Sequence, residues 1–210
     1  MIGKRKGLVQ GIGKNDTKYP SFCGGKITRE YNLWRIMLHR CSNKHRATNK
    51  AYADVSCSEN FKSYTFFYEW CNKQTGFNNK DENSRSWQLD KDLLVKGNKV
   101  YSEDTCVFVP PSINCLLNMQ HSKRGEHPVG VYWNKTQKKF IAQLSRSVKH
   151  REMLGSYETA EEAFIVYKEA KEQHIKHVAE KYKDGLDKRI YDALIAYTID
   201  YEVVGGVKYI

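Results

Sequence analysis

The 210-residue sequence contains no apolar run that approaches the roughly 20 residues needed to cross a bilayer. The basic start at Lys4, Arg5 and Lys6 also lacks the apolar stretch that would follow it in a secretory signal peptide. These absences argue against a membrane-spanning and against a secreted protein. We therefore expect a soluble cytoplasmic protein with no membrane partner.

Cysteine pairs of the Cys-x-x-Cys kind are missing as well, although the chain holds six cysteines. In a reducing compartment, this pattern argues against disulfides and against an ordinary zinc knuckle. We expect most of the six to be small buried apolar residues. A looser zinc site can be drawn from Cys41, His45, Cys57 and Cys106, but nothing in the spacing requires it.

Positively charged residues outnumber negatively charged ones. The chain has 35 lysines and arginines against 24 acidic residues, which gives a formal net charge of +11. A surplus of this size on a small protein favours a polyanionic partner, and nucleic acid is the first candidate.

The N-terminal half is predicted to begin with an arm and to continue into helices. Residues 1–28 combine glycines with lysines, a composition that suits a flexible basic arm. Apolar residues recur at helical spacing from Arg29 to Arg40, and Tyr64 to Trp70 forms a second apolar segment. We expect these two helices to pack together as the core of a first module.

Shorter elements are expected after a polar loop at 78–86. Residues 87–92 have the character of a strand, and the turn at 96–99 before Val100 suggests a hairpin or an Ω-like excursion. Ser112 can cap a helix that carries Asn114. The polar, basic segment 119–127 is the best linker in the sequence.

Beyond the linker, the pattern predicts a β-β-β-α unit. Residues 129–133, 140–145 and 151–157 have strand character, and Thr159 caps a helix with Glu162 at the capping-box position. A last helix is expected at 186–197, and the tail at 201–210 either adds a strand or stays loose. The fold class is α+β, with an arm at 1–28, modules at 29–118 and 128–183, the linker at 119–127 between them, and a C-terminal helix and tail at 184–210.

The second module resembles an AP2 domain over about 50 residues. The resemblance is carried by Gly130-Val131-Tyr132-Trp133, by Lys139 to Leu144, and by Leu154-Gly155-Ser156-Tyr157-Glu158-Thr159-Ala160-Glu161-Glu162-Ala163 through Tyr167. In that family a three-stranded sheet lies in the DNA major groove, which is wide enough to admit it. The resemblance therefore implies binding to double-stranded DNA.

Carried over position by position, the resemblance assigns base and phosphate contacts to one face of the sheet. The face contains Tyr132, Asn134, Gln143, Ser145, Arg151 and Met153, with Lys135, Arg146 and Lys149 near the phosphates. Tyr132, Asn134, Ser145 and Met153 stand where the plant transcription factors of the family carry arginine or tryptophan. The sequence preference of those proteins is therefore not transferred.

The first module is similar to phage HNH proteins, which include free-standing and intron-encoded homing endonucleases. The similarity rests on Trp34, Met37-Leu38, Arg40-Cys41, Leu89-Asp90, Tyr101-Ser102, Cys106 and Ile113-Asn114. It implies a ββα-metal module in which Asp90 and Asn114 hold one divalent cation, Mg²⁺ or Mn²⁺, for phosphodiester hydrolysis. If a phage encodes the chain, it acts in the host cytoplasm.

The family's catalytic histidine belongs directly after the aspartate, where this chain has Lys91. A lysine at its usual pKa of about 10.4 is protonated and cannot accept a proton, although its charge can stabilise the reacting phosphate. Other candidates for the base are His39 and Tyr101, the latter only if its pKa is depressed. Asp92 either supports the metal or faces solvent.

Two functions are consistent with these patterns. The first is a metal-dependent DNA endonuclease of the HNH homing type, in which the AP2-like module supplies affinity on the target. The second is a DNA-binding regulator or host-interference protein on an HNH scaffold that has lost its catalytic base. RNA ranks below both, because the major groove of A-form RNA is too narrow for a sheet. A monomer on an asymmetric site is expected in either case.

Overall fold

The computed structural model describes residues 7–16, 18–117, 127–146 and 150–199, together with the backbone of 203–204 and 207–208. The chain divides into two compact units, one of residues 1–111 with 185–187 and one of residues 112–184 with 188–210. Helices and small sheets occur in both units, in agreement with the expected α+β class. The predicted linker lies outside the described residues except for His127.

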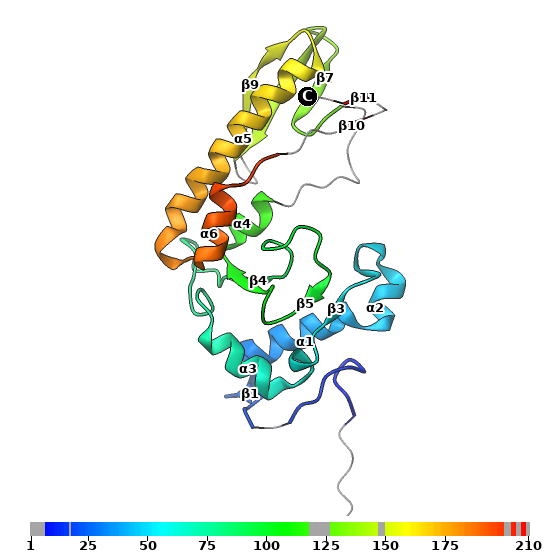
Figure 1. Ribbon diagram of the computed structural model, residues 1–210, viewed down its shortest axis with the longest axis vertical. Helices are drawn as coiled ribbons and strands as arrows, with labels where there is room; N and C mark the ends of the chain where they lie inside the picture. Colours follow the sequence, from blue (N-terminus) through cyan, green and yellow to red (C-terminus); the bar gives the residue numbers. More distant parts are fainter. Residues whose placement is uncertain are drawn as a thin grey trace, which may run out of the picture. The chain divides into compact units, whose positions relative to one another are not determined.

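The first unit contains helices and short strand pairs (Figure 1). Its helices are α1 (Arg29–Cys41), α2 (Asn43–Thr48) and α3 (Tyr64–Lys73), with 3-10 turns η1 (Lys50–Tyr52) and η2 (Asn60–Lys62). Its strands are β1 (Phe22–Cys23), β2 (Lys26–Ile27), β3 (Ser56–Cys57), β4 (Gln88–Asp90), β5 (Val100–Tyr101) and β6 (Val107–Val109).

The predicted helices α1 and α3 are confirmed, and they pack on each other. Aromatic residues fill their contact. The indole of Trp34 is fully buried and donates a 2.8 Å hydrogen bond to the carbonyl of Phe61, whose ring lies edge-on to Trp70. The buried indole therefore has its polar group satisfied, as a core tryptophan requires.

Several described residues of the predicted flexible arm contact the helices or the residues next to them. A Cβ on Gly13 would lie 2.2 Å from the Leu38 side chain, so only glycine lets the chain pass so close. Asp16 accepts a 2.9 Å hydrogen bond from the amide of Thr65, and the ring of Tyr19 stacks on Tyr68 at 3.9 Å. Composition alone did not reveal these partners.

Of the two expectations for this segment, a hairpin or an excursion, the strand pairing in the first unit agrees with an excursion. β4 is antiparallel to β6, whereas β5 is parallel to β3. Residues 91–99 therefore leave the β4–β6 pair as an excursion and do not form the turn of a hairpin between β4 and β5.

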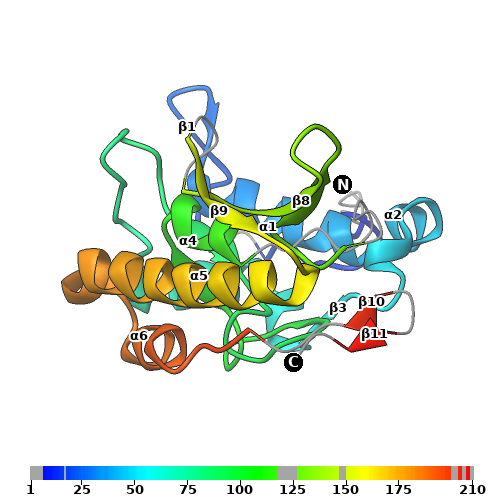
Figure 2. The ribbon, with the colours of Figure 1, turned by 90° about the horizontal axis from the view of Figure 1, so that it is seen from above.

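The second unit contains an antiparallel sheet and three helices (Figures 1 and 2). Its elements are β7 (Val131–Asn134), β8 (Lys139–Ser145), β9 (Arg151–Tyr157), α5 (Ala160–Tyr182), α6 (Lys188–Ile195), β10 (Val203–Val204) and β11 (Val207–Lys208). Helix α4 (Pro111–Leu116) belongs to the second unit except for its first residue, Pro111. The 3-10 turn η4 (Lys183–Gly185) belongs to the second unit except for its last residue, Gly185.

The predicted β-β-β-α order is confirmed. The sheet order is β7-β8-β9, and Thr159 with Glu162 forms the expected capping box at the start of α5. α5 packs Ala163, Phe164 and Tyr167 against Ala142 and Leu144 of the sheet. α6 lies along the second half of α5 in both views (Figures 1 and 2).

Within the described residues, none of the helices has the length and apolarity needed to cross a membrane.

Candidate nucleic-acid interface

The register of the three strands places the predicted contact residues on one face of the sheet. Val131, Ala142 and Leu144 point toward α5. Neighbouring residues of a strand point to opposite faces, and residues paired across strands share a face. The face away from α5 therefore contains Tyr132 and Asn134 of β7, Gln143 and Ser145 of β8, and their partners Met153 and Arg151 on β9.

This outer face is exposed at several of the predicted contact residues, whereas Ile141, which pairs with Tyr132, is fully buried. Tyr132 is 42% exposed and Met153 is 64% exposed, while Arg151 and Ser145 are also exposed. Within the described part of the chain, Arg151 forms no ion pair and no side-chain hydrogen bond. Its guanidinium group is therefore available to an anion.

Other predicted contact residues have internal partners. The side-chain oxygen of Asn134 accepts hydrogen bonds from the amides of Thr136 and Gln137, at 3.0 and 3.1 Å, and so fixes the β7–β8 turn. Arg146 is ion-paired with Glu152. Lys135 is exposed in the turn, and Lys149 lies outside the described residues.

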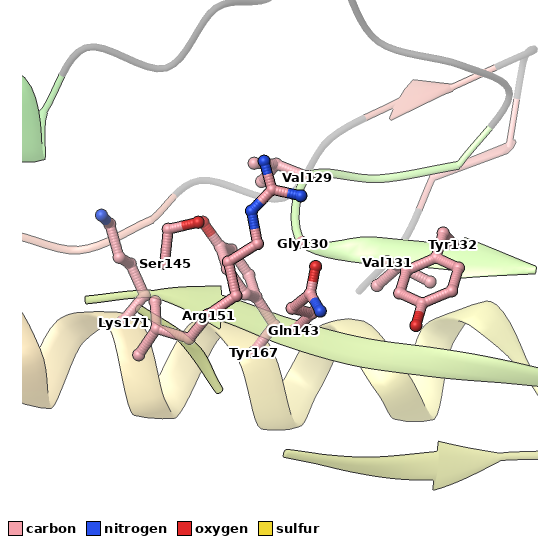
Figure 3. Close-up of a pocket in the computed structure, with 10 residues that line it drawn as sticks. Val129, Gly130, Val131, Tyr132, Gln143, Ser145, Arg151, Tyr167 and Lys171 are labelled. Atoms are coloured by element: carbon pink, nitrogen blue, oxygen red, sulfur yellow. The ribbon is translucent and has the colours of Figure 1, made fainter. Parts of the chain in front are cut away.

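A pocket of about 270 Å³ lies at the edge of the sheet, where β8 continues past the first residue of β7 (Figure 3). The amide of Gln143 donates a 2.8 Å hydrogen bond to the carbonyl of Gly130 at this edge. Gly130 has a φ of +78°, and a Cβ there would lie 2.0 Å from the ring of Tyr167. The pocket is lined by Val129, Gly130, Val131, Tyr132, Gln143, Leu144, Ser145, Arg151, Tyr167 and Lys171.

Lys171 is the functional candidate that the sequence analysis missed. It is 8% exposed, and burial lowers the pKa of its ammonium group to about 8. Within the described residues it has neither an ion-pair partner nor a hydrogen-bond partner. The available signal was a lysine four residues after Tyr167, on the stripe of α5 that packs against the sheet.

Asp90, the first of the predicted nuclease residues, is the last residue of β4 in the first unit. Oδ1 of Asp90 accepts hydrogen bonds from the amides of Asp92 and Leu93, at 2.9 and 2.8 Å. Burial, together with the charge of Asp92, raises the pKa of the Asp90 carboxyl to about 6. The main chain therefore already occupies one of its two oxygens.

The three candidates for the base lie in different surroundings. Lys91 is ion-paired with Asp92 at 3.0 Å and donates to the carbonyl of Asn98 at 3.1 Å. Burial raises the pKa of Tyr101 to about 12, opposite to the shift that proton abstraction needs, and its hydroxyl accepts a hydrogen bond from Arg40. His39 is exposed, with its ring 4.7 Å from that of His45.

A metal site does not form from the described carboxylates, histidines and cysteines. No three of them lie close enough together to hold an ion, whether at Asp90 or at the four residues of the alternative zinc site. Asn114 is on α4 in the second unit, whereas Asp90 is in the first. Oδ2 of Asp90 is not engaged by the main-chain hydrogen bonds to Oδ1, and the ligand pair of Asp90 and Asn114 stays a prediction.

In comparisons with known proteins, no family model, curated protein or solved structure matches the chain.

Proposed function

We propose that this protein binds duplex DNA through the outer face of the β7–β8–β9 sheet. One observation carries the proposal: contact residues that the sequence predicts on three separate strands all belong to the face opposite α5. A sheet face of this kind fits the major groove of B-form DNA, which is about 12 Å wide.

The chemistry of the face supports this partner. Arg151 offers a planar fork of N–H donors, and Gln143 offers an amide that can donate to and accept from base edges. The net charge of +11 adds attraction to phosphates that does not depend on base sequence. Affinity is therefore expected to fall steeply as salt is raised.

The proposal is tested by placing a negative charge on the face. Met153→Glu puts a carboxylate at a 64% exposed position, so the fold should tolerate it. We expect the affinity for a labelled duplex to fall by about tenfold or more, because a like charge next to phosphates is repelled. Fluorescence anisotropy over a range of salt concentrations measures the change.

A matched control is available on the other side of the sheet. Ile165 is 40% exposed on α5, and Ile165→Glu makes the same chemical change away from the proposed surface. Its affinity should stay within about twofold of the unmodified protein, since a single distant charge is largely screened at physiological salt. Equal losses in the two variants would count against the proposed face.

Phosphodiester cleavage is the second candidate function, and the environment of Asp90 favours it. Half-buried carboxylates with a raised pKa, as Asp90 has, cluster at functional sites. The test is incubation of long DNA with the protein and Mg²⁺ or Mn²⁺, beside Asp90→Ala. The first proposal predicts intact DNA with salt-sensitive binding, whereas cleavage that Asp90→Ala abolishes would establish a nuclease.

A further inference from the structure

The pocket at the sheet edge is lined by two cationic residues and no acidic one. Arg151 reaches it from β9 and Lys171 from α5. Figure 3 shows the side chains of Lys171, Ser145, Arg151 and Gln143 extending to the same side. Within the described part of the chain, none of these four side chains has a hydrogen-bond or ion-pair partner.

A buried cation without a partner destabilises a fold, and proteins rarely retain one without a compensating contact. Lys171 is 8% exposed, and its lowered pKa arises from burial alone, since no neighbouring charge contributes. Among the described residues, the ammonium nitrogen of Lys171 is not one of the fully buried polar atoms without a partner, so an anion can reach it from the pocket.

The donors around the pocket match a phosphate group. Guanidinium N–H groups form paired hydrogen bonds to phosphate oxygens, and an ammonium group adds a compact charge. The hydroxyl of Ser145 and the amide of Gln143 can donate to the remaining oxygens.

We propose that this pocket seats one phosphate group of the DNA backbone, an inference that rests on the proposed function. Four of its lining residues, Tyr132, Gln143, Ser145 and Arg151, also belong to the outer face of the sheet. A duplex on that face would bring its backbone to the pocket. Lys171 then serves as a phosphate contact that α5 adds to the surface of the sheet.

The test compares Lys171→Met with Lys176→Met in the full chain. Both variants remove one positive charge from α5, but Lys176 is exposed and does not line the pocket. Binding to a labelled duplex is measured over a range of salt concentrations. We expect Lys171→Met to lose about tenfold in affinity and to reduce the slope of log K against log salt by about 0.9, the value for one lost phosphate contact. Lys176→Met should change affinity by less than about twofold.

A second measurement identifies the source of the phosphate. Thermal unfolding is followed in sodium phosphate and in sodium chloride of equal ionic strength, because a ligand that binds only the native state raises the melting temperature. We expect phosphate to stabilise the unmodified protein and to leave Lys171→Met unchanged. This readout does not depend on DNA binding.

The outcomes separate the two proposals. A duplex affinity and salt slope that are the same in Lys171→Met and in the unmodified protein would overturn the pocket while leaving the proposed function intact. Absence of DNA binding, with phosphate stabilising only the unmodified protein, would overturn the proposed function and the DNA source of the phosphate, and would assign the pocket to free phosphate.

Discussion

Lys91 in the first unit and Lys171 in the second are each 8% exposed, yet their surroundings are opposite. Lys91 has an ion pair with Asp92, a hydrogen bond to the carbonyl of Asn98 and the ring of Tyr101 at 5.7 Å. Lys171 has no such partner among the described residues. Lys91 thus has its partners inside the protein, whereas Lys171 is the cation for which we propose a partner from outside.

The largest expected effect is the loss of stability in Lys91→Met. The substitution leaves Asp92 and the carbonyl of Asn98 without their partner, and we expect the free energy of unfolding to fall by about 2–3 kcal/mol. Urea denaturation at pH 7 measures it. Lys62→Met, which breaks only the surface pair with Glu59, is the control and should cost less than about 1 kcal/mol.

Lys171→Met, in contrast, is expected to raise the free energy of unfolding, because it removes a charge that has low exposure and no partner among the described residues. The lowered pKa of Lys171 implies that the folded protein disfavours its ammonium form, so the variant should gain about 1–2 kcal/mol at pH 7. This gain in the free energy of unfolding is complete below pH 8, where Lys171 is charged in both the folded and the unfolded protein. It should disappear as the pH rises toward 10.5, and a loss of stability at pH 7 would break the comparison with Lys91.

A smaller effect is the coupling between Arg151 and Lys171 in DNA binding. If both contact one phosphate, removal of either weakens the hold on that phosphate, and removal of the second then costs less. A cycle of Arg151→Ala, Lys171→Met and the double variant should give a combined loss about 1 kcal/mol smaller than the sum of the single losses. Strictly additive losses would place the two side chains on different phosphates.

The smallest expected effect is the pH dependence of duplex affinity. Arg151 of β9 lines the same pocket as Lys171, and burial, together with the charge of Lys171, lowers the pKa of His174 on the same helix below its usual value. With its pKa lowered, His174 stays neutral between pH 7 and 9. Lys171 loses its proton in this interval, so duplex affinity should fall about three- to tenfold, and Lys171→Met should show a flat profile.

Local patterns in the sequence predicted the second unit well. The capping box of Thr159 and Glu162 is formed by residues three apart, and the alternation of apolar and polar residues defined the strands close to their observed bounds. The resemblance to an AP2 domain assigned residues such as Tyr132 and Met153 to one face, and the strand register places them together. These features depend on near neighbours in the chain, which a sequence displays directly.

Contacts between distant residues were not predictable in this way. The pairing of β4 with β6, the packing of Gly13 on Leu38 and the burial of Lys171 each depend on which segments meet in the fold. The glycines of the arm suggested flexibility because their composition resembles that of linkers. Gly13 instead has a fixed place, since its missing side chain lets the backbone approach α1 closely.

The length of α5 determines which segment of this part of the protein can be exchanged intact by recombination. The first half of the helix covers the sheet, while Ile175 and Ala179, in the second half, are buried in the region that α6 packs against. Ile199, beyond α6, returns to the core of the sheet. A gene exchange that ended at residue 183 would leave this apolar surface in water, so recombination between related genes should carry the sheet, α5, α6 and residues through 199 as one piece.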